Sequence, residues 1–224
     1  MRTDMASHGS RQGPYTIYVV DDDEATATGM TRLLGAAGFA VRAHASAAEF
    51  LATFKPQGAG CIILDVRLPD VSGLDLQKVI AGRDDPLPII FLTGHAEVPD
   101  SVRAIQRGAI DFLTKPVDPH VLLDAVSRAL AKDAIDRRQR ERDHDARALY
   151  ERLTPREREV FAHLISGQLN KQVAADLQIS VRTIKLHRAR IFEKLQMDSI
   201  AGLTRLALEL RIDPAADPHS TKDL

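Results

Sequence analysis

Two short apolar runs in the first half of this 224-residue chain end abruptly at acidic side chains. The run 17–20 is followed by Asp21 and Asp22, and the run 61–64 is followed by Asp65. In open α/β sheets the carboxyl ends of parallel strands meet at one edge, so these carboxylates should share a cleft. Neighbouring carboxylates raise one another's pKa and stay ionised when a cation lies among them. An oxygen-rich acidic site of this kind favours Mg²⁺.

Two further runs end at groups that would complement a phosphoryl ligand. Thr93 follows the run 88–92 and supplies a hydroxyl donor, and Lys115 follows the run 110–113 and supplies a fixed positive charge. With a metal neutralising charge in the transition state, these groups can hold a phosphoryl group that is transferred onto a carboxylate. An ordinary salt-bridge network around a lysine explains one of the aspartates but not the whole set.

The elements that must position these groups form an alternating series. The expected strands are the short apolar runs 17–20, 40–44, 61–64, 88–92 and 110–113. Amphipathic helices should separate them, with Ser46 and Asp118 as two of the capping residues. This order predicts an α/β doubly wound, five-stranded parallel sheet with right-handed crossovers. Neither GxGxxG nor GxxxxGK[ST] follows a strand, which weakens a nucleotide-binding interpretation.

The net charge of −1 conceals an asymmetry between the two halves of the chain. Residues 15–119 hold 9 Lys/Arg and 14 Asp/Glu, a balance of −5, whereas residues 151–211 hold 11 and 7, a balance of +4. An acidic half joined to a basic half predicts two domains, of which the second faces a polyanion. The opposite charges also leave open that the acidic half masks the basic half.

Composition indicates a soluble, cytoplasmic protein. The single cysteine, Cys61, can form no internal disulfide and is expected to be a buried thiol in a reducing compartment. No apolar run approaches the roughly 18 residues of a membrane helix, and no signal pattern opens the chain. Residues 1–14 and 212–224 have little to bury and are expected to be disordered.

The second half is predicted to be all-helical. Its helices are expected to begin at the capping residues Thr154 (with Glu157 completing a capping box), Asn170, Ser180 and Ser199. A short helix, a three-residue turn and a longer helix rich in Arg and Lys form a helix-turn-helix pattern. The preceding residues 131–149 are mostly charged and continue no a/d apolar repeat, so they predict a solvated helical linker rather than a coiled coil.

Through the motifs VVDDDE (19–24), LDVRLPDVSG (64–73), LTGH (92–95) and DFLTKP (111–116), residues 15–130 resemble the receiver domains of two-component response regulators. The resemblance implies that Asp65 accepts a phosphoryl group from a sensor histidine kinase. It further implies that Mg²⁺ is held by Asp21 (partly through water), Asp22, Asp65 and the backbone carbonyl of Arg67.

The same resemblance implies roles for residues after the last two strands. Thr93 and Lys115 would contact the phosphoryl oxygens, and the Lys115–Pro116 peptide bond would be cis. Phe112 occupies the position of the family's aromatic switch residue, which would act together with Thr93. A phenylalanine that simply fills the core is an equally good interpretation of Phe112.

The second half resembles the LuxR-type DNA-binding domain of the NarL/FixJ class of response regulators. The match runs through 153–195, LTPREREVFAHLISGQLNKQVAADLQISVRTIKLHRARIFEKL, and the LTGHAEVP segment and the long charged linker place the chain nearer FixJ. The resemblance implies that the third helix of this domain enters the major groove and that the fourth mediates dimerisation. The ranges 15–130 and 150–211 are the expected receiver and DNA-binding domains.

A helical wheel places the candidate DNA contacts independently of the resemblance. Ile184, His187 and Ile191 should face the core, with His187 as a hydrogen-bonded core residue and Arg188 too near the core to contact a base. Of the exposed side chains, Lys185 and Leu186 suit base edges, whereas cations on the flanks suit phosphates. The predicted DNA-binding residues are Lys171, Arg182, Thr183, Lys185, Leu186, Ala189 and Arg190.

These observations predict a phosphorylation-activated transcription regulator rather than an enzyme. Its expected partners are a sensor histidine kinase, double-stranded promoter DNA, RNA polymerase and a second copy of the chain after phosphorylation. One alternative is a regulator that works without phosphorylation, with the receiver as a dimerisation platform. Another is a Mg²⁺-dependent phosphohydrolase with Asp65 as nucleophile, against which the absence of a DxD motif counts, since Arg67 stands at the +2 position.

Overall fold

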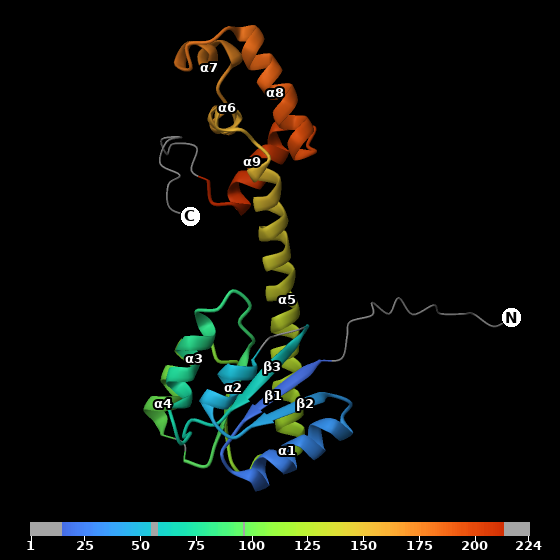
Figure 1. Ribbon diagram of the computed structural model, residues 1–224, viewed down its shortest axis with the longest axis vertical. Helices are drawn as coiled ribbons and strands as arrows, with labels where there is room; N and C mark the ends of the chain where they lie inside the picture. Colours follow the sequence, from blue (N-terminus) through green and yellow to red (C-terminus); the bar gives the residue numbers. More distant parts are fainter. Residues whose placement is uncertain (1–14, 55–57, 96, 213–224) are drawn as a thin grey trace, which may run out of the picture. The chain divides into compact units, whose positions relative to one another are not determined.

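The structure is a computed structural model that describes residues 15–54, 58–95 and 97–212, and the expectations for 1–14 and 213–224 lie outside the described residues. The chain divides between Arg137 and Arg138 into two compact units. Figure 1 shows a mixed α/β unit coloured blue to yellow-green and a helical unit coloured orange to red. Each unit has its own hydrophobic core.

Within the described residues, the first unit contains a five-stranded sheet of order β2-β1-β3-β4-β5 in which every pairing is parallel. The strands are β1 (Thr16–Val20), β2 (Ala40–His44), β3 (Gly60–Leu64), β4 (Ile89–Thr93) and β5 (Asp111–Thr114). The predicted doubly wound parallel sheet is therefore confirmed, with strand ends within a residue of the apolar runs. Gly60 admits no larger residue, because a Cβ there would lie 2.1 Å from the Thr16 carbonyl oxygen.

Helices cover both faces of this sheet (Figure 1). They are α1 (Glu24–Ala36), α2 (Ala47–Thr53), α3 (Gly73–Ala81), α4 (Val98–Gln106) and α5 (Pro119–Glu151). Side chains alternate along a strand, so Ile62 packs in the cluster with α2, α3 and α4 while Ile63 packs in the cluster with α1 and α5. Burial on both faces explains why β3 is a continuous apolar run rather than an alternating one.

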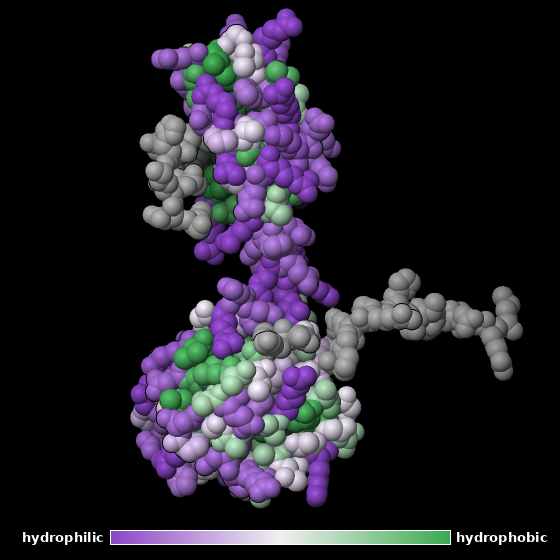
Figure 2. Space-filling view, viewed as in Figure 1, coloured by the Kyte–Doolittle hydropathy of each residue, from purple (hydrophilic) through white to green (hydrophobic). Residues whose placement is uncertain are grey.

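Helix α5 continues without a break from the sheet into the charged segment. Asp133, fully buried, accepts a 3.0 Å hydrogen bond from the Gly60 backbone N–H, and Arg137 donates to the Gly58 carbonyl oxygen. Contacts of α5 with the first unit therefore extend to Arg137. From residue 138 to 145 the helix surface is hydrophilic (Figure 2), as the composition of this segment predicts. No helix in the described residues is both long and apolar enough to cross a membrane.

The second unit is all-helical, as predicted, and consists of α6 (Pro155–Ile165), α7 (Asn170–Asp176), α8 (Val181–Leu195) and α9 (Ile200–Glu209). Its core includes Phe161, Ile184 and Leu203, and the last turns of α5 join it through Ala146. The predicted capping residues Thr154, Ser180 and Ser199 each accept a backbone N–H bond at the start of their helices.

The prediction that Asn170 caps α7 is wrong. Leu169 is the N-cap, and its backbone N–H donates to the Gln172 side chain at 2.8 Å. Asn170 is instead the first residue of the helix, and its Oδ1 accepts a 2.8 Å hydrogen bond from Arg188 of α8. The side chain that the pattern assigned to a local cap thus joins the two helices of the helix-turn-helix, because a tertiary partner competes for its oxygen.

Candidate functional site

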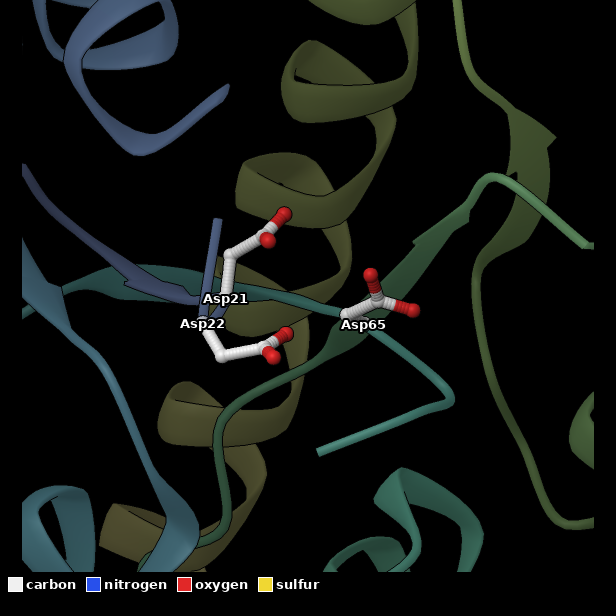
Figure 3. A group of neighbouring side chains, drawn as sticks. All are labelled: Asp21, Asp22 and Asp65. Carbon is white, nitrogen blue, oxygen red and sulfur yellow. The ribbon is translucent and has the colours of Figure 1, made fainter. Parts of the chain in front are cut away.

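Three carboxylates meet at the carboxyl edge of the sheet (Figure 3). Asp21 and Asp22 follow β1 and Asp65 follows β3, and one oxygen of each lies within 4.8 Å of the others. The two strands are hydrogen-bonded neighbours, and the Asp65 N–H donates to the Val20 carbonyl oxygen at 2.9 Å. Asp21 and Asp65 are buried and Asp22 is exposed. The register of two parallel strands therefore assembles the predicted acidic cluster.

Lys115 extends into this cluster from the loop after β5. Its Nζ lies 2.6 Å from Asp21 Oδ2 and 2.7 Å from Asp65 Oδ2. The Lys115–Pro116 bond is cis, as expected, and the Lys115 backbone N–H donates to the Thr93 carbonyl oxygen at 2.8 Å. The pocket thus joins the ends of β1, β3 and β5 through one ammonium group.

The charges of the pocket favour a bound cation. Burial raises the pKa of Asp21, although hydrogen bonds from Lys115 and from the Asp23 backbone act in the opposite direction. Burial also disfavours the charged form of Lys115, but the hydrogen bonds of Asp21 and Asp65 outweigh it and raise the Lys115 pKa. Three carboxyl groups thus face one ammonium. The all-oxygen donor set and the excess of negative charge fit Mg²⁺, with Asp21, Asp22 and Asp65 as the side chains that could hold it.

The loop after β3 fixes the orientation of Asp65. Its Oδ1 accepts a 3.1 Å hydrogen bond from the Arg67 N–H, and the Gly73 N–H donates to the Val66 carbonyl oxygen at 2.8 Å. A Cβ at Gly73 would lie 2.1 Å from the Asp65 carbonyl oxygen, so only glycine fits there. In the sequence, Gly73 is recognisable only as the last residue of the motif 64–73. Its close approach to Asp65 follows from the folded loop.

Thr93 and Phe112 lie on the two strands beyond β3. Thr93 is the last residue of β4 and 1% exposed, and its Oγ1 accepts a long 3.4 Å bond from the His95 N–H. Phe112 of β5 is half-buried and packs against Phe91, with ring centroids 5.8 Å apart. A half-buried ring is compatible with both interpretations of Phe112, as a switch and as part of the core.

On α8 the structure exposes the side chains that the helical wheel assigned to DNA. Ile184, Ile191 and Leu195 are buried. The predicted DNA contacts Lys171, Arg182, Lys185, Leu186, Ala189 and Arg190 are exposed. Thr183 is half-buried, and its hydroxyl lies 2.8 Å from that of Ser180, the N-cap of α8. The exposed set therefore offers three cations and two apolar side chains on the second helix of the helix-turn-helix, and Lys171 on the first.

The two residues expected near the core differ from each other. Arg188 is half-buried, donates to Asn170 and lies over the Phe192 ring at 6.0 Å, so its guanidinium is held within the unit. His187 is half-buried but lines a cleft, and its Nδ1 has no hydrogen-bond partner among the described residues. His187 is therefore not the hydrogen-bonded core residue that the wheel predicts.

Comparisons with known proteins match both units. Residues 17–127 match the response regulator receiver domain, and residues 151–207 match the luxR family of bacterial regulatory proteins. Response regulator protein TmoT of Ectopseudomonas mendocina is 40% identical over 87% of this chain and 89% of its own. Transcriptional regulatory protein FixJ of Azorhizobium caulinodans is 39% identical over 92% and 97%.

Solved structures of response regulators resemble the chain over most of its length. The response regulator StyR is 40% identical with a TM-score of 0.76, covering 88% of this chain and all of its own. Full-length FixJ from B. japonicum is 35% identical with a TM-score of 0.54, covering 91% of this chain and 99% of its own. The likeness thus extends over both units rather than one.

Proposed function

This chain belongs to the NarL/FixJ class of two-component response regulators, and we propose that a phosphoryl group on Asp65 controls its binding to promoter DNA. A receiver domain followed by a LuxR-type domain makes it a transcription regulator. The observation that carries the proposal is the position of Lys115, whose ammonium bridges the buried carboxylates of Asp21 and Asp65. A structural ion pair with Lys115 would need only one carboxylate. Phosphoryl transfer needs the additional carboxylates, one as the nucleophile and the others to hold Mg²⁺.

In the proposed reaction the Asp65 carboxylate attacks the phosphorus of a phosphohistidine on the sensor kinase. A P–O bond forms, the P–N bond breaks, and the histidine leaves with the bonding electron pair. Asp22, Asp65 and the Arg67 carbonyl, with Asp21 partly through water, would hold Mg²⁺, which would supply positive charge to neutralise the phosphoryl oxygens. The Lys115 ammonium is already within hydrogen-bond distance of Asp65, so it can contact a phosphoryl oxygen with little rearrangement.

Thr93 and Phe112 would carry the signal out of the pocket. Among the described residues, the Thr93 hydroxyl accepts a long bond from the His95 N–H, so a phosphoryl oxygen offers it a better partner. Movement of Thr93 would alter the space beside Phe91 and the half-buried Phe112 ring. The proposed result is homodimerisation, which places two α8 helices on promoter DNA and allows contact with RNA polymerase.

On DNA, the amino-terminal part of α8 would enter the major groove. Lys185 and Leu186 would contact base edges, and Arg190 with Lys171 would contact phosphates. The full proposed contact set is Lys171, Arg182, Thr183, Lys185, Leu186, Ala189 and Arg190, of which all but Thr183 are exposed.

The test uses Asp65→Asn with a small phosphodonor and Mg²⁺. Intact mass should show one phosphoryl group on the wild-type chain and none on the variant, which should also keep its unphosphorylated association state. Asp75→Asn is the matched control, because Asp75 is an exposed carboxylate of α3 paired with Lys78. Uptake by Asp65→Asn would refute the choice of nucleophile.

Two alternatives give different results in the same experiment. A regulator that works without phosphorylation would bind DNA equally well as wild type and as Asp65→Asn, with or without the donor. A phosphohydrolase would turn over many phosphate esters per chain, whereas a phosphorylated regulator retains about one phosphoryl group.

A further inference from the structure

A cleft of about 570 Å³ opens beside the carboxyl-terminal half of α8. His187, Arg190 and Lys194 are spaced three and four residues apart, so they lie on one face of that helix. The opposite wall comes from the α5–α6 connection and the first turn of α6. The residues that matter for its chemistry are Arg152, Glu157, His187, Arg190, Glu193 and Lys194.

Two of these charged residues, Glu157 and Lys194, form an ion pair with each other. Glu157 is 2% exposed, its Oε2 accepts a hydrogen bond from the Thr154 N–H, and Lys194 Nζ lies 2.6 Å from the same oxygen. Although burial alone would raise the Glu157 pKa, the bonds from Lys194 and Thr154 lower it, so this carboxylate remains ionised and paired. Neither Glu157 nor Lys194 is thus left to attract a ligand.

The remaining charges give the cleft a positive excess. Arg152 and Arg190 are exposed, and neither guanidinium makes a hydrogen bond or ion pair with a described residue. Glu193 is the one remaining acid among the lining residues. A planar guanidinium offers paired N–H donors that match phosphate oxygens, so two free arginines favour an anion.

His187 adds a directed donor to this charge. Its ring is half-buried in the cleft, and its Nδ1 is without a partner among the described residues. A buried polar atom without a hydrogen bond is costly, and a ligand that satisfies it recovers that cost. A neutral imidazole can carry its proton on Nδ1, and in that tautomer Nδ1 can donate to an oxyanion.

We propose that this cleft binds a phosphate of the DNA backbone, with Arg152 and Arg190 as its ionic contacts and His187 as a hydrogen-bond donor. The proposal rests on the proposed function, because it requires α8 to lie on DNA. Lys185 and Leu186 occupy the turns before the cleft, so bases and phosphate would be contacted by successive turns of one helix. Phosphate contacts of this kind set the register of a recognition helix without reading sequence.

Arg152 provides the cleanest test, because its side chain is exposed and its loss leaves the core intact. In the full-length chain, Arg152→Gln should weaken binding to the preferred site and to random DNA alike, by about fivefold to tenfold at 0.1 M salt. The slope of log affinity against log salt should fall in magnitude by about 0.9, the value for one phosphate contact. Arg142→Gln is the matched control, since Arg142 is an exposed arginine of α5 outside the cleft.

His187 is tested by a pair of substitutions. His187→Leu removes the donor and should lower affinity for both DNAs by roughly tenfold, the effect of one hydrogen bond to a charged group. His187→Gln retains an N–H donor and should recover part of that loss, which a purely structural role would not predict. Thermal unfolding of both variants shows whether the unit is intact, and Arg152→Gln decides the question if His187→Leu does not fold.

The possible results separate the cleft from the proposed function. Wild-type affinity and slope for Arg152→Gln, together with wild-type affinity for a folded His187→Leu, on a chain that binds DNA, would overturn the cleft assignment and leave the proposed function standing. A loss confined to the preferred site would also overturn it, because a phosphate contact carries no sequence information. A wild-type chain with no salt-dependent DNA binding would overturn both.

Discussion

The phosphorylation pocket and the DNA-binding helix are built in opposite ways. In the pocket, Asp21, Asp65 and Lys115 come from distant parts of the chain, and the sheet places the Lys115 Nζ 2.6 Å from Asp21 Oδ2 and 2.7 Å from Asp65 Oδ2. On α8, Lys185 and Leu186 are adjacent residues of a single helix and are exposed. The pocket groups are joined by ion pairs in a largely buried site, whereas the helix side chains are exposed to solvent.

This difference sets how the two regions should respond to substitution. Charges in a low-dielectric pocket interact strongly, so removing one member changes the others and effects should not add. Exposed side chains on a helix act nearly independently, so their contributions to DNA affinity should add within a few tenths of a kcal/mol. Substitutions in the coupled pocket should therefore have larger effects than substitutions on the weakly coupled surface.

The largest effect is expected for Lys115→Met. Loss of the ammonium that contacts the phosphoryl oxygens should slow uptake from a small phosphodonor by about 100-fold. Mg²⁺ binding should persist or tighten, because the carboxylates lose the competing ammonium of Lys115. Quenched-flow mass spectrometry and a Mg²⁺ titration measure the two effects. Lys78→Met, an exposed lysine on α3, is the control, and loss of Mg²⁺ binding in Lys115→Met would make its role structural.

Gly73→Ala tests whether the backbone of the loop that holds Asp65 can move to admit a larger side chain. A Cβ placed 2.1 Å from the Asp65 carbonyl oxygen forces the loop to shift, at a cost of about 3 kcal/mol in unfolding free energy. Gly35→Ala in α1 is the control, because nothing lies within 4 Å of that Cβ and helix propensity favours alanine. Denaturant titrations compare the two, and equal stability would show that the loop relaxes freely.

On the surface, Lys185→Ala should separate base contacts from phosphate contacts. It should cost roughly 1–3 kcal/mol on the preferred site and much less on random DNA. Arg190→Ala and Lys171→Ala should weaken both DNAs alike and reduce the salt slope by about one. Binding titrations at several salt concentrations distinguish these patterns. A uniform loss for Lys185→Ala would reassign Lys185 to the backbone.

The smallest effect is expected at the Lys194–Glu157 pair. In the folded state the pKa of Glu157 is lowered from its usual 4.5. The ion pair therefore stabilises the fold at pH values above 4.5, and this stabilisation is lost as the pH falls through the folded-state pKa. Lys194→Met should cost about 0.5–1 kcal/mol at pH 7, because Lys194 is partly exposed, and almost nothing at pH 3. Thermal unfolding at both pH values measures this, and a pH-independent difference would assign the effect to packing.

Much of the fold follows from local patterns. Short apolar runs ended by charge predict the strands within a residue, because strand burial on both faces requires uninterrupted apolar residues. The buried side of α8, with Ile184 and Ile191, follows from helical periodicity alone. Capping at Ser180 and Thr154 also follows, since a side-chain oxygen there bonds an N–H within three residues.

Local patterns failed where a side chain had a distant partner. The sequence pattern predicts Asn170 as a helix cap, but its Oδ1 accepts a hydrogen bond from Arg188 on the other helix of the helix-turn-helix. His187 falls on the apolar side of the wheel, yet the packing around α8 leaves a cleft at that point. The anchorage of α5 through Asp133 was equally hidden, because its partner Gly60 is 73 residues away in the sequence.

The sequence by itself determined which chemical groups stand at the strand ends and which face of α8 is exposed, because both depend on periods of two to four residues. Only the tertiary structure decided that Lys115 bridges Asp21 and Asp65, that Gly73 touches the Asp65 backbone, and that Arg152 and His187 share a cleft. These contacts join residues distant in sequence, and their existence depends on strand register and helix packing rather than on any local preference.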